Sequence, residues 1–173
     1  MKYFVFAGLL TMLISGCSFF TVEPYHEIRK FDPQCPDENH PLILPEIAPI
    51  RNLTPAGTKM LFNRSVVQAE NPTEQWVQPP EAMLYRYLLT RRDPARQLPG
   101  NLRLTIVSFK LDNGHQTAEL AVDAAFDRQH RQFRVSAPLP ACNGTAAATA
   151  IGTCFEELAR ELAAWCRPAA PAK

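Results

Sequence analysis

The sequence has few glycines, no excess of charge of either sign and no long apolar run. Only 7 of its 173 residues are glycine, and 18 Lys+Arg stand against 17 Asp+Glu, a net charge of +1. A nucleic-acid-binding protein needs a basic excess to neutralise phosphates, so this balance argues against one. No glycine-rich loop suited to cradling a phosphate occurs. The composition, 46% hydrophobic, suits one globular domain with a single core.

The N-terminus carries the most specific motif. An apolar run from Tyr3 to Ile14 follows a short basic start, and it is too short for a membrane span of roughly 20 residues. It closes with Leu13-Ile14-Ser15-Gly16-Cys17, which resembles the lipobox of bacterial lipoproteins. The resemblance implies a signal peptide over residues 1–16, a diacylglyceryl group on the Cys17 thiol and acylation of the new amine. The alternative is a core strand that happens to contain a cysteine.

Lipidation predicts a tether to a bacterial membrane, because two or more acyl chains anchor a protein stably. Ser18 follows the lipidated cysteine. In the sorting pattern of enterobacterial lipoproteins, serine here is typical of the outer membrane, with inner-membrane retention as the alternative. We therefore expect the periplasmic face of the outer membrane.

Four cysteines remain in the predicted mature chain, an even number suited to an oxidising compartment. They are Cys35, Cys142, Cys154 and Cys166. Cys154 and Cys166 are expected on one helix about 18 Å apart, too far for a disulfide. Of the two remaining arrangements we favour Cys142–Cys154 with Cys35–Cys166. No cysteine or histidine spacing typical of a zinc site occurs, so no metal or other cofactor is predicted.

The hydrophobic pattern predicts an α+β fold with an antiparallel or mixed sheet and two helices packed on one face, in the order β-β-α-β-β-β-α. Residues 17–41 form a proline-punctuated spacer, residues 42–167 a single domain and residues 168–173 a frayed tail. Strands are expected in two apolar segments and in an alternating three-stranded meander. One helix should start at the Pro79-Pro80 pair, and a longer one should end before Pro168. The expected strands are 42–50, 59–67, 102–106, 118–126 and 133–137, and the long helix is 146–166.

Four features occur together in this order: the lipobox, the segment Gln75-Trp76-Val77-Gln78-Pro79-Pro80, the meander and an Ala-rich C-terminal helix. The combination resembles the ABC-type transport auxiliary lipoprotein family, of the paraquat-inducible protein C type, over residue 17 and residues 42–166. The resemblance implies a non-catalytic partner of mammalian-cell-entry (MCE) domain proteins, which move lipids between the two membranes, and a homo-oligomeric ring. The chain departs from the family in its four mature cysteines and in Pro45 and Pro49 of the first strand.

Three residues are candidates for contact with a partner protein. Trp76 precedes the first helix and is either a docking aromatic or a core residue. Arg128 and Arg131 lie at the expected 118–126/133–137 hairpin and form either a partner contact or a solvated rim. Asp123 and Glu119 should lie on the solvent-exposed face of the sheet.

We do not expect an enzyme. The histidines are scattered through spacer and turn segments, and no nucleophile lies in a suitable context. They are His26, His40, His115 and His130. The alternative to a transport role is an outer-membrane assembly lipoprotein that partners a barrel or a secretin. A periplasmic lipoprotein enzyme would need convergent polar groups, for which the sequence offers no candidate set.

Overall fold

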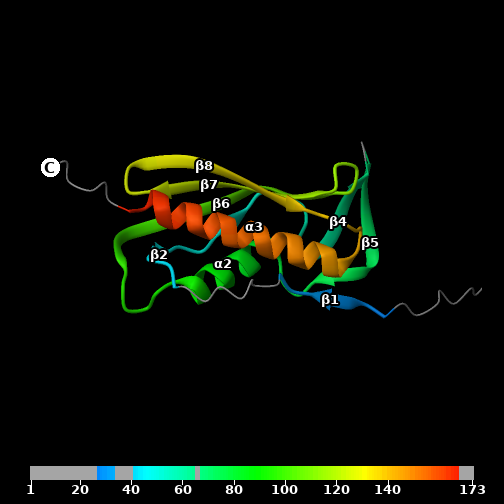
Figure 1. Cartoon of the computed structure of the whole chain (residues 1–173), viewed down its shortest axis with the longest axis horizontal. Coiled ribbons are helices and arrows are strands. Elements are labelled where there is room, and N and C mark those ends of the chain that lie inside the picture. Colours follow the sequence, from blue (N-terminus) through cyan, green and yellow to red (C-terminus); the bar gives the residue numbers. More distant parts are fainter. Residues whose placement is uncertain (1–26, 34–40, 65–66, 168–173) are drawn as a thin grey trace, which may run out of the picture.

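The computed structural model describes residues 27–33, 41–64 and 67–167, with side chains omitted for 64–72. These residues form one mixed eight-stranded sheet and two helices (Figure 1). The strands are β1 (Arg29–Phe31), β2 (Pro45–Ile47), β3 (Arg51–Asn52), β4 (Lys59–Arg64), β5 (Val67–Trp76), β6 (Leu98–Asp112), β7 (Thr117–Phe126) and β8 (Gln129–Pro138). The helices are α2 (Pro80–Arg91) and α3 (Gly144–Trp165).

The long strand β6 organises the sheet. One of its edges pairs antiparallel with β7, which pairs antiparallel with β8, so the predicted meander is confirmed. Its other edge pairs in parallel with the short strands β2 and β3 and then with β4. Beyond β4 the sheet continues through β5 to β1. The short β2 and β3 fit the prolines of that segment, since proline is confined to edge strands and strand ends.

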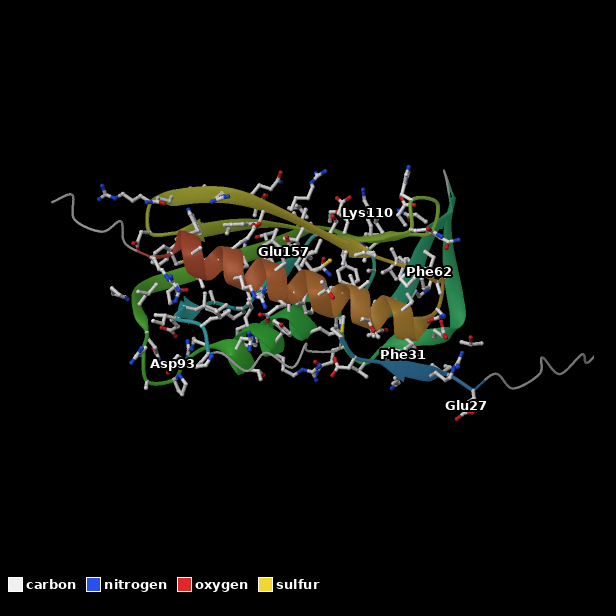
Figure 2. The ribbon with its side chains drawn as sticks, viewed as in Figure 1. Glu27, Phe31, Phe62, Asp93, Lys110 and Glu157 are labelled. Carbon is white, nitrogen blue, oxygen red and sulfur yellow. The ribbon has the colours of Figure 1, made fainter. Side chains whose placement is uncertain are left out.

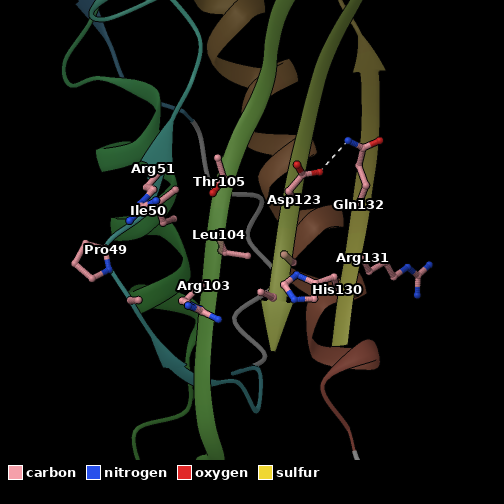
Figure 3. Close-up of a pocket in the computed structure, with 13 residues that line it drawn as sticks. Pro49, Ile50, Arg51, Arg103, Leu104, Thr105, Asp123, His130, Arg131 and Gln132 are labelled. Carbon is pink, nitrogen blue, oxygen red and sulfur yellow. Dashed lines mark hydrogen bonds between the residues drawn. The ribbon is translucent and has the colours of Figure 1, made fainter. Parts of the chain in front are cut away.

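Both helices cover the same face of the sheet (Figures 1 and 3), so the predicted α+β fold is confirmed. On β7, Leu120 and Val122 are fully buried, and the more polar Glu119 and Asp123 on either side of them are more exposed. Phe155 and Leu158 of α3 complete this core. Alternation of apolar residues with period 2 on the strand and the apolar stripe on the helix therefore meet at one interface.

The two helices begin where the sequence indicates. Pro79 is the N-cap of α2, and Glu81 lies in its first turn, where a carboxylate favours the positive end of the helix. Asn143 caps α3 by accepting a hydrogen bond from the Ala146 N–H at 2.9 Å. Within the described residues, no helix combines the length and the apolar character needed to span a membrane.

The strands differ from the prediction at several places. The expected strand 42–50 is instead two short strands, β2 and β3, and β8 begins at Gln129 rather than at residue 133. Residues 29–31, expected in the spacer, form β1, so the spacer does not extend to residue 41 as one segment. β5 was not predicted, because its sequence is polar and contains Pro72. β6 begins at Leu98 rather than at residue 102, since Gly100 continues the strand with φ +106°. A Cβ on Gly100 would lie 2.8 Å from the Phe126 ring, so the strand needs glycine there.

Candidate functional site

The predicted lipidation site, Cys17, lies outside the described residues, as does Cys35. The described chain begins at Glu27 and joins the sheet at β1, which pairs in parallel with the end of β5 (Figure 2). Arg29 donates to Glu74 of β5 at 2.8 Å, and the other Glu74 oxygen accepts the Gly144 N–H of α3 at 2.8 Å. The Glu74 side chain is buried, so one carboxylate joins β1, β5 and the positive end of α3.

Aromatic packing strengthens the attachment of β1. The Phe31 ring lies so close to Gly144 that a Cβ there would be 2.3 Å from it. The Phe31 carbonyl accepts a hydrogen bond from the Val77 N–H at 2.9 Å, and Arg86 of α2 pairs with Asp32. The strand nearest the predicted tether is therefore joined to the sheet and to both helices.

Trp76 is not available to a partner. It is 1% exposed, and its ring contacts Phe109 edge to face with centroids 5.8 Å apart. The prediction of a partner contact at Trp76 is therefore wrong, and its alternative, a core tryptophan, describes the structure. The reason is that β5 ends under the helical layer, so the side chain points into the core.

The cysteine prediction needs correction. Cys142, Cys154 and Cys166 form no disulfide with one another. Because α3 starts at Gly144, roughly 15 Å of helix separates Cys142 from Cys154, far beyond disulfide reach, so that favoured pairing is wrong. Cys166 lies at the opposite end of α3 and cannot reach Cys142 either. The pairing of Cys35 with Cys166 stays a prediction.

Burial makes two of these thiols unreactive. Burial in the core, followed by the negative charge of Glu157, raises the pKa of Cys154 to about 12. Its Sγ lies 3.7 Å from the Ala118 carbonyl oxygen. Burial, followed by the Asp127 charge, raises the pKa of Cys166 to about 11. Neither thiol has the lowered pKa of a catalytic nucleophile.

A charged cluster is buried between the two helices. Glu156 of α3 accepts hydrogen bonds from Tyr87 at 2.5 Å and Arg91 at 2.7 Å, both on α2, and from Arg160 at 2.9 Å. Burial alone would raise the pKa of Glu156. The hydrogen bonds from Tyr87 and Arg91, with the Arg91 charge, together outweigh burial and hold that pKa below its usual value. The cluster joins α2 to α3, and its groups are engaged with one another.

A hollow in the described surface lies on the other face of the sheet. It is an open groove of about 830 Å³ that runs across β6, β7 and β8 beside the segment 48–51 (Figure 3). Asp123 accepts a hydrogen bond from Gln132 at 2.8 Å within it. The polar residues on this face that line it are Arg51, Arg103, Thr105, Asp123, His130 and Gln132, and Arg131 lies at its edge.

The two predicted contact arginines lie at the margin of this groove. Arg131 borders it but points away in Figure 3, with its guanidinium carbon 4.8 Å from the centroid of the Phe133 ring. Arg128 is exposed in the β7–β8 turn and does not line the groove. Arg51 and Arg103 are not among the residues predicted from the sequence to contact a partner. Alternation over residues 102–106 already pointed Arg103 outward, but no local signal placed Arg51 beside it.

The other titratable residues do not converge. His115 lies 3.0 Å from Asp112 in the exposed β6–β7 turn, far from His130 in sequence. Glu119 and Asp123 lie on the solvent-exposed face of β7, as expected. Over residues 27–33, 41–64 and 67–167, no group of three or more His, Cys, Asp or Glu side chains could hold a metal ion. His26 and His40 fall outside those ranges.

Comparison of the sequence with protein-family models and with curated proteins gives no match. Solved structures share the fold. Protein XCC0632 from Xanthomonas campestris, of the family DUF330, is 17% identical and superposes with a TM-score of 0.57 over 80% of this chain and 93% of its own. A second, uncharacterized protein is 11% identical, with a TM-score of 0.59 over 82% of this chain and 98% of its own. At such identities the likeness establishes the fold alone.

Proposed function

We propose that this chain is a non-catalytic lipoprotein component of an ABC/MCE-type lipid transport system, anchored in the outer membrane and docked on the transporter from the periplasm. The observation that carries the proposal is the lipobox ending at Cys17, twelve residues before the first strand at Arg29. A chain of that length reaches at most about 40 Å, so the domain would work close to the membrane surface.

The resemblance over residues 42–166 supports the transport assignment. The way β1 is held supports the tethering role. Arg29, Glu74 and Gly144 join the strand nearest the tether to the sheet and to α3, so the position of the anchor would be transmitted to the whole domain. The groove opposite the helices is a surface suited to contact with a partner.

The test is a mild crosslink in intact cells, followed by pulldown of the tagged lipoprotein and mass spectrometry. We expect recovery of an MCE-domain protein together with its ABC partners. The matched control is Cys17→Ser, which cannot be lipidated. We expect this variant to be lost from the membrane fraction and to recover much less of the partner protein. Recovery of a barrel or a secretin without an MCE protein would overturn the proposal and favour the assembly-lipoprotein alternative.

A further inference from the structure

The polar residues of the groove come from four neighbouring strands and share one face. Arg51 of β3 is paired with Thr105 of β6, Thr105 with Asp123 of β7, and Asp123 with Gln132 of β8. Paired residues in adjacent strands point to the same side of a sheet, so this row faces away from the helices. In the next row along the sheet, Arg103 pairs with Ala125, which pairs with His130.

The charges of the groove are unbalanced. The Asp123 carboxylate accepts a hydrogen bond from Gln132, whereas the side chains of Arg51 and Arg103 make no hydrogen bond or ion pair with another residue in the described part of the chain. The side chains of two exposed arginines and of His130 thus line the same groove as a single carboxylate, which is already hydrogen-bonded. The whole sequence carries a net charge of only +1, so this is a local excess. Guanidinium groups bind carboxylates and phosphates through paired hydrogen bonds.

The form of the groove favours a peptide over a lipid. Leu104 and Ala124 belong to its lining, but their side chains are buried toward the core. The floor therefore offers backbone and short side chains, and no apolar channel for an acyl chain is formed by these residues. A shallow surface that crosses four strands is instead suited to an extended segment that contacts several side chains at once.

We propose that this groove binds an extended acidic segment of a partner protein, with Arg51 and Arg103 each receiving a carboxylate. Arg51 and Arg103 are diagonal neighbours on adjacent strands, so their Cα atoms are about 7–8 Å apart. Carboxylates two residues apart in an extended chain lie on one face about 7 Å from each other. The segment would therefore carry Asp or Glu at alternate positions. The inference rests on the proposed function in that the transporter would supply the segment.

The binding test uses the full chain, purified from membranes in a non-ionic detergent, and a fluorescent peptide of alternating Glu and Thr. We expect saturable binding by anisotropy, weakened at least about tenfold by the double charge reversal Arg51→Glu, Arg103→Glu, since charge-assisted hydrogen bonds are lost and repulsion is introduced. The control Arg96→Glu, Lys110→Glu makes the same double charge reversal at two exposed residues outside the groove and should leave the affinity within about twofold. Circular dichroism checks that all three proteins are folded.

Equal weakening by Arg96→Glu, Lys110→Glu would overturn the inference, because binding would then reflect overall charge. Equal binding of a Gln-Thr peptide would overturn it as well. Vesicles containing phosphatidylglycerol provide the lipid comparison. Tighter binding of these vesicles than of the peptide, dependent on Arg51 and Arg103, would overturn the proposal of an acidic segment and identify the ligand as a phosphate headgroup.

A second arm separates this inference from the proposed function. The crosslink and pulldown are repeated in cells that carry the Arg51→Glu, Arg103→Glu variant. Loss of the MCE-domain protein from this variant, but not from Arg96→Glu, Lys110→Glu, supports both proposals. Undiminished recovery from the double variant rejects the groove as the docking surface while leaving the transport role intact. If the wild type itself recovers no MCE protein, the transport role fails, and the peptide measurement decides on the groove independently.

Discussion

Arg91 of α2 and Glu156 of α3 form an ion pair with 2.7 Å between Nη2 and Oε1, and both side chains are buried. The residues are 65 positions apart in the sequence, yet their pairing joins the two helices that cover the sheet. Tyr87 adds a hydrogen bond to the same carboxylate. A buried charge is tolerated only with such partners, so the cluster specifies how the helices lie against each other.

Replacement of Glu156 by glutamine should destabilise the protein by about 3–5 kcal/mol, because the Arg91 charge then stays buried without its carboxylate. Urea unfolding followed by circular dichroism measures the change. Glu157 is the adjacent, exposed carboxylate on the same helix. Glu157→Gln should change the free energy of unfolding by less than about 0.5 kcal/mol. Equal effects of the two substitutions would contradict a stabilising role for the buried cluster.

Glu156 should also contribute to acid sensitivity. Its pKa in the folded protein is held below its usual value, which in an unfolded chain is about 4.3. Its stabilising contribution is therefore complete above that pH and is lost as the pH falls through the folded-state pKa. The stability difference between the wild type and Glu156→Gln should shrink below about pH 4.3 in urea unfolding from pH 7 to pH 3. A difference that stays constant over this range would show that the carboxylate does not titrate as described.

The Glu74 carboxylate should control the attachment of β1. Glu74→Gln weakens the pairing with Arg29 and the interaction with the positive end of α3, at a cost of about 1–3 kcal/mol. We expect faster amide hydrogen exchange in β1, measured by mass spectrometry, while β7 stays protected. Glu27→Gln, an exposed substitution just before β1, is the control. Unchanged exchange at Lys30 and Phe31 in the Glu74 variant would contradict this role.

Gly144→Ala should displace the Phe31 ring. The new methyl group would lie 2.3 Å from that ring, a distance no packed pair tolerates, so the strand or the ring must move. Overpacking of this kind costs about 1–3 kcal/mol. Thr145→Ala, at the next and exposed position, should have little effect. If the contact is the cause, Gly144→Ala in a Phe31→Ala background should cost much less than in the wild type, a comparison made by urea unfolding.

The thiols should react in a defined order. Cys142 is half-buried, whereas burial raises the pKa of Cys154 to about 12 and that of Cys166 to about 11. After reduction of the protein and removal of the reductant, iodoacetamide at pH 8 should therefore alkylate Cys142 first and the other two only in denaturant. Peptide mass spectrometry resolves each site. Alkylation of Cys154 at the rate of Cys142 in the native protein would show that α3 opens readily from the sheet.

Local patterns in the sequence were sufficient for the helices and the meander. The Pro79-Pro80 pair located the start of α2, and alternation of apolar residues located the core of β7 and β8. The same reasoning did not find β1 and β5. β5 is polar and contains Pro72, and β1 has only three residues whose partners lie 45 positions away. Such strands are formed by pairing with distant segments, for which their own residues carry little signal.

The candidate site was the feature least predictable from the sequence. Alternation placed Arg103 on an outward face, but only the parallel pairing of β3 with β6 brought Arg51 next to it. The start of α3 at Gly144 likewise excluded the Cys142–Cys154 disulfide. The sequence by itself determined the helix starts, the strand alternation and the lipobox motif, because these depend on residues close together in the chain. Only the tertiary structure decided that Trp76 and Glu74 are buried and which charges share a face, because those outcomes depend on contacts between segments up to 70 residues apart.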